Sequence, residues 1–173
     1  AAAAAARRGC RTLLIERYGF LGGMGTAAGV TNFCGLHANV FGEHRRVIRG
    51  LADELLGSLE RLGGLCEPHR MFQDKIMAQA YDNAAFKLAA DELVAGSGSK
   101  LLFHAYAAGV VMRSASEVAA LLVETKSGRG AVIGRIYIDC SGDGDVAAAA
   151  GVPYEKGDGQ GGMLYPSTMF RVN

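Results

Sequence analysis

The first sixteen residues constrain the fold more than any other part of the chain. Residues 1–9 are alanine-rich and close on Gly9, a composition typical of a helix that stops at a glycine. Residues 11–16 are a short apolar run that ends in Glu16, typical of a parallel strand buried on both faces. A helix, a turn and a strand that ends in a carboxylate form the second half of a dinucleotide-binding βαβ unit, in which the carboxylate accepts hydrogen bonds from a ribose. We therefore expect an α/β fold with a nucleotide at the end of this strand.

The first half of such a unit, a strand followed by G-x-G-x-x-G, does not stand before Ala1, and there is no initiator Met. We therefore expect a fragment that begins inside the helix after the phosphate loop. Asn173 falls within an extended segment, so we expect the other end to be incomplete as well. Without the phosphate loop several hydrogen bonds to a diphosphate are lost, and the alternative that the fragment binds nothing stays open.

With 173 residues, of which 50% are hydrophobic, the chain can fold around a core. Its 18 basic and 17 acidic residues give a net charge of +1, which disfavours nucleic acid and anionic membranes as partners. No apolar stretch reaches the roughly 20 residues of a membrane-spanning helix. The cysteines lack C-x-x-C spacing, which favours reduced thiols and a cytoplasmic protein, with a removed N-terminal signal as the open alternative. They are Cys10, Cys34, Cys66 and Cys140.

The middle of the chain divides into a helical part and a strand-rich part. Apolar residues recur at helical spacing over 45–63, and Asp82 is placed to cap a second helix that ends at Gly96. Four short runs separated by turn residues then predict an antiparallel β-meander, and the last of them leads through a glycine turn into a helix over 146–150. These runs are 100–106, 109–112, 118–125 and 131–139.

Two segments carry a resemblance to a known family. One is Ile15-Glu16-Arg17-Tyr18-Gly19-Phe20-Leu21-Gly22-Gly23-Met24, and the other is Asp139-Cys140-Ser141-Gly142-Asp143-Gly144-Asp145-Val146-Ala147. In this order and at this separation they resemble the FAD-dependent oxidoreductases, flavoproteins similar to glutathione reductase and succinate dehydrogenase. The resemblance implies a Rossmann-like, three-layer FAD/NAD(P)-binding fold with an antiparallel meander. It implies a partial FAD-binding domain over 1–156 and the start of a substrate domain or flavin-covering segment over 157–173.

The first segment points to the adenosine and diphosphate side of FAD. A carboxylate at the C-terminal end of a parallel strand lies where ligands bind in open α/β sheets, so Glu16 is expected to hold both ribose hydroxyls. The resemblance places Arg17 beside the adenine or the diphosphate, with a solvated surface arginine as the alternative. It places Gly22, Gly23 and Met24 along the diphosphate and the flavin edge, where main-chain N–H groups face the cofactor, with a plain tight turn as the alternative.

The second segment supplies further cofactor contacts in the resemblance, from Ser141, Gly142 and Asp143. Its small residues let the strand end approach the diphosphate, helped by the dipole of the helix that follows, while Asp143 contacts the ribityl or ribose side. The alternative for Asp143 is a helix cap, a role for which Asp145 is the more typical candidate. The resemblance also implies that main-chain groups of the strand after the long helix contact adenine, which by position points to Ala107 or Ala108.

Candidates for catalysis are few. Cys34 and His37 follow the loop of Gly22, Gly23 and Met24, which the resemblance places at the flavin. They are weak candidates for a reacting thiol and a proton donor, respectively, with a structural role in the core as the favoured alternative. The remaining histidines lack the spacing of metal ligands, so no metal site is expected. They are His44, His69 and His104.

The resemblance implies an enzyme that transfers a hydride or an electron pair between a small organic substrate and the flavin of FAD, as a homo-oligomer or with a redox partner protein. Two alternatives stay open. A flavin-binding electron-transfer subunit would expose the flavin edge, whereas a pocket closed by residues 168–172 favours the enzyme. A nicotinamide-dependent dehydrogenase would use Glu16 in the same way, without requiring the segment that begins at Ser141.

Overall fold

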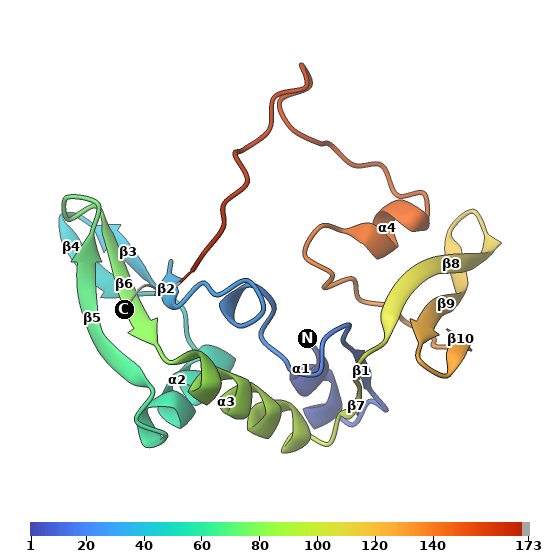
Figure 1. The fold of residues 1–173 in the computed structure, drawn as a ribbon, viewed down its shortest axis with the longest axis horizontal. Coiled ribbons are helices and arrows are strands. Elements are labelled where there is room, and N and C mark those ends of the chain that lie inside the picture. The colour runs from blue at the N-terminus through green and yellow to red at the C-terminus, as the bar shows by residue number, and fades with distance from the viewer. Residues whose placement is uncertain (171–173) are drawn as a thin grey trace. The chain divides into compact units, whose positions relative to one another are not determined.

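The computed structural model describes residues 1–170, and the chain divides into two units that are described separately. Unit 1 contains Ala1 and the segments 12–19 and 100–168. Unit 2 contains the segments 2–11 and 20–99 together with the last described residues, 169–170. Figure 1 traces both units along the chain.

The parallel part of unit 1 is a pair of short strands. β1 (Leu13–Ile15) and β7 (Lys100–Leu102) run parallel, with Leu13 opposite Lys100 and Ile15 opposite Leu102. The prediction of a strand buried on both faces is wrong, because β1 is three residues long and Leu13 is 41% exposed. The exposure of β1 follows from its pairing. Among the described residues, β7 is the one strand hydrogen-bonded to β1, so the other edge of β1 has no partner strand.

The predicted meander is confirmed in unit 1. β8 (Tyr106–Ser114), β9 (Glu117–Thr125) and β10 (Gly128–Val132) form an antiparallel sheet with β9 in the centre (Figure 1). The Thr125 hydroxyl donates to the carbonyl of Gly128 at 3.0 Å and closes the turn between β9 and β10. The buried side chains of this unit come mainly from the central strand and from the residue before the sheet. They are Ala105, Ala120, Leu121 and Val123.

The last predicted strand, 131–139, is regular only up to Val132. Beyond it the chain carries exposed isoleucines at 133, 136 and 138, and no described strand pairs with it. Tyr137 fixes this stretch instead, because its hydroxyl accepts the Gly134 N–H at 2.7 Å and lies 3.1 Å from the carbonyl of Ala119. The predicted strand is therefore wrong beyond Val132, because no strand among residues 1–170 supplies the pairing.

A short helix and a long extended segment complete unit 1. α4 (Asp145–Ala149) follows the glycine turn and contacts β8. It begins one residue before the predicted helix over 146–150. Residues 152–168 contain no helix or strand and are exposed. Residues 171–172 of the predicted pocket-closing segment lie outside the described residues.

Unit 2 begins with the predicted alanine-rich helix. α1 (Ala2–Arg7) ends at a turn in which Gly9 adopts a φ of +82°, so the glycine stop is confirmed. Arg7 forms a bidentate ion pair with Glu54, with both N···O distances 2.7 Å. This pair ties α1 to the next helix of the unit.

Five strands of unit 2 were not predicted. β2 (Asn32–Cys34), β6 (Ile76–Tyr81) and β5 (Leu65–Met71) form an antiparallel sheet with β6 in the centre, and β3 (His37–Val40) pairs with β4 (Glu43–Arg46) as a hairpin. Figure 1 shows the hairpin beside this sheet, and β3 contacts β6.

Two helices pack beside that sheet. α2 (Leu51–Arg61) starts after Gly50, whose N–H donates to the Asp53 carboxylate at 2.8 Å. The prediction of one helix over 45–63 is therefore wrong at its start, because the chain before Gly50 pairs as β4 and only then turns. α3 (Asn83–Ala95) starts at the predicted cap, where Asp82 accepts the Ala85 N–H at 2.8 Å.

The core of unit 2 lies between these helices and β6. Leu59 of α2 is fully buried, and the rings of Tyr81 and Phe86 meet edge to face with centroids 4.9 Å apart. Phe33 of β2 adds a third ring, 4.3 Å from that of Tyr81. Burial of each large apolar side chain contributes about 1.5–3 kcal/mol, so this aromatic cluster is a main source of stability in unit 2. The buried members are Leu36, Leu56, Leu59, Tyr81, Phe86 and Ala89.

Candidate functional site

Glu16 stands directly after β1 and is held on two sides. Its N–H donates to the carbonyl of Leu102 at 2.9 Å, and its carbonyl accepts the Ala105 N–H at 3.1 Å. Its carboxylate is half-buried and accepts the Tyr18 N–H at 2.9 Å. An ionised carboxylate can accept about four hydrogen bonds. The bond to Tyr18 therefore orients the group at the C-terminal end of a parallel strand and leaves it able to accept ligand hydroxyls.

Arg17 is exposed and packs on its own neighbour. Its Nη2 donates to the Tyr18 hydroxyl at 2.7 Å, and the guanidinium lies 4.7 Å from the centroid of that ring. The chain beside it is tightly turned: the His104 N–H donates to the Tyr18 carbonyl at 3.1 Å, with His104 at a φ of +53°. A Cβ added to Gly19 would lie 2.7 Å from the His104 ring. This turn ends β7 at Leu102, which is why the predicted strand over 100–106 is shorter than expected.

The glycine loop of unit 2, residues 20–26, has several of its carbonyls bound by side chains. The Thr26 hydroxyl donates to the Leu21 carbonyl at 2.7 Å and is buried. The Asn83 side-chain amide donates to the carbonyls of Gly25 and Thr26, at 3.2 and 3.0 Å. The Tyr81 hydroxyl lies 3.1 Å from the same Gly25 carbonyl, and burial raises the pKa of Tyr81. The loop is thus fixed by side chains from β6 and the start of α3.

The glycines of this loop differ in what surrounds them. Gly23, Met24 and Gly25 form a single 3₁₀ turn, entered through Gly22 at a φ of +114°. A Cβ added to Gly22 would lie 2.4 Å from the Thr26 side chain, so Gly22 is required by packing as well as by conformation. A Cβ on Gly23 would meet nothing within 4 Å, although Gly23 also has a positive φ of +51°. Met24 is 70% exposed. The open space above Gly23 fits the expected approach of a ligand to the main chain.

The second motif is organised by Asp139, a residue that the sequence reasoning did not single out. Its Oδ1 accepts the Ser141 N–H and its Oδ2 accepts the Ala147 N–H, both at 2.8 Å. Burial opposes the charge, but the hydrogen bonds from Ser141, Ala147 and Val146 outweigh it, so the pKa of Asp139 lies below its ordinary value.

The helix-cap alternatives for Asp143 and Asp145 are wrong, because neither side chain caps α4. Asp139 accepts the Ala147 N–H instead, and the Ser141 hydroxyl accepts the Asp145 N–H at 3.0 Å. The Asp139 carboxylate therefore already interacts with the positive end of the helix dipole.

The turn between these bonds contains the predicted contact residues. Gly142 and Gly144 have φ values of +98° and +74°, and a Cβ on either would meet nothing within 4 Å. Ser141, Gly142 and Asp143 are all exposed. Among residues 1–170, no hydrogen bond uses the N–H of Gly142 or Asp143. The turn therefore presents its main chain and one carboxylate outward.

Ala107 lies on β8 opposite Val123 of β9. The register shifts directly after it, because Gly109 pairs with Leu122 and the residue between them, Ala108, is left out of the ladder. Such a bulge frees main-chain groups, and bulges are over-represented beside functional sites. This geometry is compatible with the expected main-chain contact to adenine at Ala107 or Ala108.

The two weak catalytic candidates lie on two strands of unit 2 that are consecutive in the chain but belong to different sheets. Cys34 on β2 is exposed, so the expectation of a core position is wrong for it. His37 on β3 is half-buried, and its Nδ1 has no hydrogen-bond partner among the described residues. Burial first, and then the charges of Arg46 and His44, hold the pKa of His37 below its ordinary value. A neutral imidazole at pH 7 suits proton acceptance, but no described group stands ready to exchange a proton with it.

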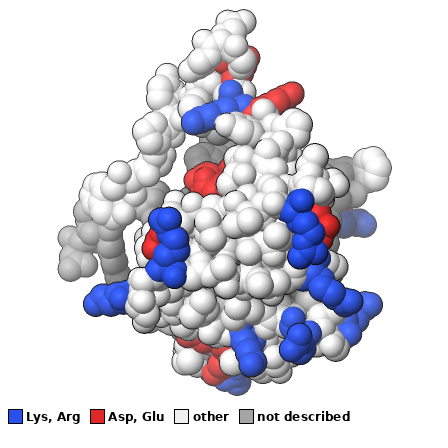
Figure 2. Space-filling model, turned by 90° about the vertical axis from the view of Figure 1, so that its right-hand side faces the viewer, with Lys and Arg blue, Asp and Glu red and all other residues white. Residues whose placement is uncertain are grey.

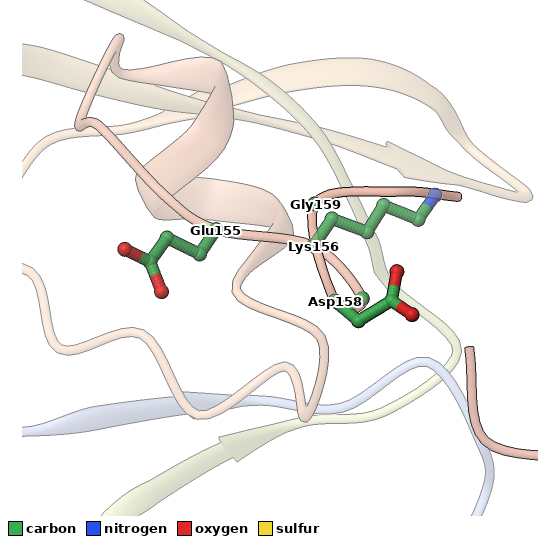
Figure 3. Close-up of a pocket in the computed structure, with 5 residues that line it drawn as sticks. Glu155, Lys156, Asp158 and Gly159 are labelled. Carbon is green, nitrogen blue, oxygen red and sulfur yellow. The ribbon is translucent and has the colours of Figure 1, made fainter. Parts of the chain in front are cut away.

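One hollow of about 500 Å³ lies at the glycine-rich segment of unit 1 and is lined by the five residues 155–159. Figure 3 shows the Glu155 side chain pointing to the opposite side from Lys156 and Asp158. The Asp158 Oδ1 accepts N–H groups from Gln160 and Gly162 at 2.9 and 2.8 Å, and these bonds lower the pKa of Asp158. The carboxylate thus closes the loop on itself, and none of the predicted site residues lines this hollow.

Charges of both signs share the surface drawn in Figure 2. Many are paired: Arg46 with Asp53 at 2.5 Å and Arg61 with Glu92 at 2.8 Å are examples in unit 2. Within residues 1–170 no group of three histidine, cysteine or acidic side chains is placed to hold a metal ion. No described helix is both long and apolar enough to cross a membrane.

Comparison with known proteins places these features in a family. A family model described as FAD dependent oxidoreductase matches residues 1–173. The chain belongs to the FAD-dependent oxidoreductases. The expectation from the two motifs is thereby confirmed, as is FAD as the cofactor of the family. No curated protein matches the chain in sequence.

A solved structure supports the fold of this FAD-dependent oxidoreductase. THI4 from Thermovibrio ammonificans superposes with a TM-score of 0.53 at 14% sequence identity. The match covers 86% of this chain and 55% of the THI4 chain, so the chain spans about half the length of that protein. The likeness confirms the expected mixed α/β, Rossmann-like fold with its antiparallel meander.

The predicted residues fall in both units of the family member. Six lie in unit 1, and they are Glu16, Arg17, Ala107, Ser141, Gly142 and Asp143; five lie in unit 2, and they are Gly22, Gly23, Met24, Cys34 and His37. Within unit 1, no hydrogen bond or ion pair of the described residues joins Glu16 to the 141–143 turn. The chemistry of these groups nevertheless fits FAD: a carboxylate can accept from ribose hydroxyls, and glycine N–H groups with open space beside them can donate to phosphate oxygens.

Proposed function

We propose that this chain binds FAD with the adenosine ribose on Glu16, and that the whole protein exchanges a hydride or an electron pair between a small organic substrate and the flavin. The observation that carries the proposal is the Glu16 carboxylate, which is held by the Tyr18 N–H at the C-terminal end of β1. Vicinal ribose hydroxyls are two donors, and an oriented carboxylate offers two acceptor oxygens in the crevice where α/β sheets bind ligands.

The proposal also assigns a cofactor contact to the glycine loop of unit 2, argued from that unit alone. Thr26, Tyr81 and Asn83 hold the carbonyls of the loop inward, so Gly23 and Met24 are left to turn their N–H groups towards the diphosphate and the flavin edge. The absence of a side chain at Gly23 lets the cofactor approach, in agreement with the open space around it.

The turn at 141–143 contributes the second main-chain contact of the proposal. Its outward N–H groups suit phosphate or hydroxyl oxygens, and Asp143 suits a hydroxyl of the ribityl or ribose side. Arg17 lies next to Glu16 in the chain and is proposed to flank the adenine by moving off Tyr18, while the bulge after Ala107 supports a main-chain contact to the same base.

The proposed FAD-binding domain covers residues 1–156, and the segment 157–173 is proposed to lead into a substrate-binding or flavin-covering part. The open edge of β1 supports a larger sheet, because isolated parallel pairs are rare and parallel strands are normally buried on both sides. A further strand on this edge would also bury the exposed Leu13.

When bound, FAD supplies the redox chemistry, and the protein supplies placement and electrostatics. Substrate recognition is proposed to lie outside the residues that hold the cofactor. His37 is proposed as a weak candidate for an acid or base, with a pKa that burial holds below its ordinary value, and Cys34 is proposed as a weak candidate for a reacting thiol. The scattered cysteine positions, without C-x-x-C spacing, support a cytoplasmic protein, acting as a homo-oligomer or delivering electrons to a redox partner protein.

The proposal is tested by flavin retention. The purified chain is incubated with FAD, passed through a gel-filtration column and examined by its visible absorbance spectrum. We expect flavin to elute with the protein, and to do so less with Glu16→Ala. Flavin that elutes only in the small-molecule fraction, at every concentration of protein, would overturn the proposal.

A further inference from the structure

A single carboxylate fastens both ends of the turn that precedes α4. Asp139 accepts the Ser141 N–H with one oxygen and the Ala147 N–H with the other, both at 2.8 Å. The residues between them form a loop whose ends are joined through one side chain. Hydrogen bonds to an ionised acceptor are roughly twice as strong as those between neutral groups, so this closure is the strongest local restraint on the turn.

The turn has few restraints of its own. Gly142 and Gly144 have left-handed φ values and open surroundings, and glycine loses more conformational freedom than any other residue when it is ordered. α4 contains five residues, which is too few for a helix that is stable by itself. One further bond, from the Asp145 N–H to the Ser141 hydroxyl at 3.0 Å, lies inside the loop that Asp139 closes.

The other two carboxylates of this segment do not share the task. The side chains of Asp143 and Asp145 are exposed and accept no hydrogen bond among residues 1–170. The three aspartates lie within seven residues, but only Asp139 accepts hydrogen bonds from the turn and α4 among the described residues. Replacing Asp145 removes a carboxylate without opening the turn, so it serves as a control for the loss of a negative charge.

We infer that Asp139 is a positioning residue of the cofactor site, which fastens the turn so that the main chain of Gly142 and Asp143 is held ready for FAD. The inference rests on the proposed function, because it assigns a task to a residue that touches no ligand. A loop ordered in advance loses less entropy on binding, so the closure by Asp139 raises the affinity for FAD.

The test compares Asp139→Asn, Asp139→Ala and the matched control Asp145→Asn in the full chain. Asn keeps one acceptor oxygen and the shape of the side chain, whereas Ala removes both acceptors. FAD affinity is measured by flavin fluorescence, and amide hydrogen exchange is followed at Ser141 and Ala147 without FAD. We expect the FAD dissociation constant to rise about 10-fold in Asp139→Asn and further in Asp139→Ala, and exchange at both amides to accelerate. Asp145→Asn should match the wild type in both measurements.

Three results would overturn the inference. Exchange at Ser141 and Ala147 that does not change in Asp139→Asn would show that the closure is absent. Faster exchange with FAD affinity equal to that of Asp145→Asn would show a role in local structure alone. Equal loss of affinity in Asp145→Asn would assign the effect to charge. A wild-type chain that binds no FAD would overturn the proposed function, while hydrogen exchange would still report on the closure by Asp139.

Discussion

Replacing Glu16 gives the most specific test of the ribose assignment. Each hydrogen bond to a charged acceptor is worth about 1.5–3 kcal/mol, so loss of the two proposed bonds to the ribose removes about 3 kcal/mol or more. This corresponds to a rise of about 100-fold in the dissociation constant of FAD for Glu16→Ala. The bond from the Tyr18 N–H is lost as well, which loosens the chain next to β1.

Glu16→Gln separates the two effects. Its amide oxygen can still accept the Tyr18 N–H, but it lacks the charge and the second acceptor oxygen, so we expect a rise of about 10-fold. Glu117→Gln is the matched control, because Glu117 lies in the exposed β8–β9 hairpin, where it pairs with Arg113 at 2.8 Å. Exposed pairs of this kind contribute little to stability.

The assay is a fluorescence titration of each variant with FAD and with FMN. FMN has no adenosine, so its binding should be the same in the wild type and in Glu16→Ala. Equal FAD affinities for Glu16→Ala and wild type would refute the assignment. Equal losses for FAD and FMN would place the effect of Glu16 on the general structure of the site instead of on the ribose.

Three further predictions concern other parts of the proposed site. Gly23→Val should abolish FAD retention but leave the thermal midpoint within a few degrees of wild type, because its positive φ costs about 1 kcal/mol. Gly22→Ala should lower the thermal midpoint strongly, because its Cβ would lie 2.4 Å from the Thr26 side chain. Flavin retention by Gly23→Val would show that the loop lies away from the cofactor. The folded-state pKa of Asp139 is below its ordinary 3.8, so its contribution to stability is present above pH 3.8 and is lost as the pH falls through the folded-state pKa. The free energies of unfolding of wild type and Asp139→Asn should therefore converge at low pH. A difference that stays constant with pH would contradict this. His37→Ala should slow flavin reduction by substrate in the whole protein without changing FAD affinity, and an unchanged reduction rate would return His37 to a structural role.

Local signals explain what could be predicted of the fold. The Asp82 cap, the glycine after α1 and the turn residues of the meander each act within a few residues of chain, and all are found where expected. β2 depends instead on a distant partner, because it pairs with β6 more than forty residues later. β5 contains Pro68 and five consecutive exposed residues, so no apolar alternation marks it.

The candidate site shows the same division. Glu16 and the glycines were recognisable because strand ends and glycine loops leave a mark in the sequence. The residues that hold the loops in place were missed, since Tyr81 and Asn83 reach the Gly25 carbonyl across more than fifty residues. Asp139 was visible only as the first letter of the second motif, although an acid two residues before a serine at a helix start is a recognisable turn signal.

A crystal structure of the chain with FAD is the most direct test of the ribose assignment. We expect both adenosine ribose hydroxyls within hydrogen-bond distance of the Glu16 carboxylate, and the cofactor in contact with the main chain at Gly23 and Gly142. FAD bound with its ribose away from Glu16, while that carboxylate holds only the Tyr18 N–H, would contradict it.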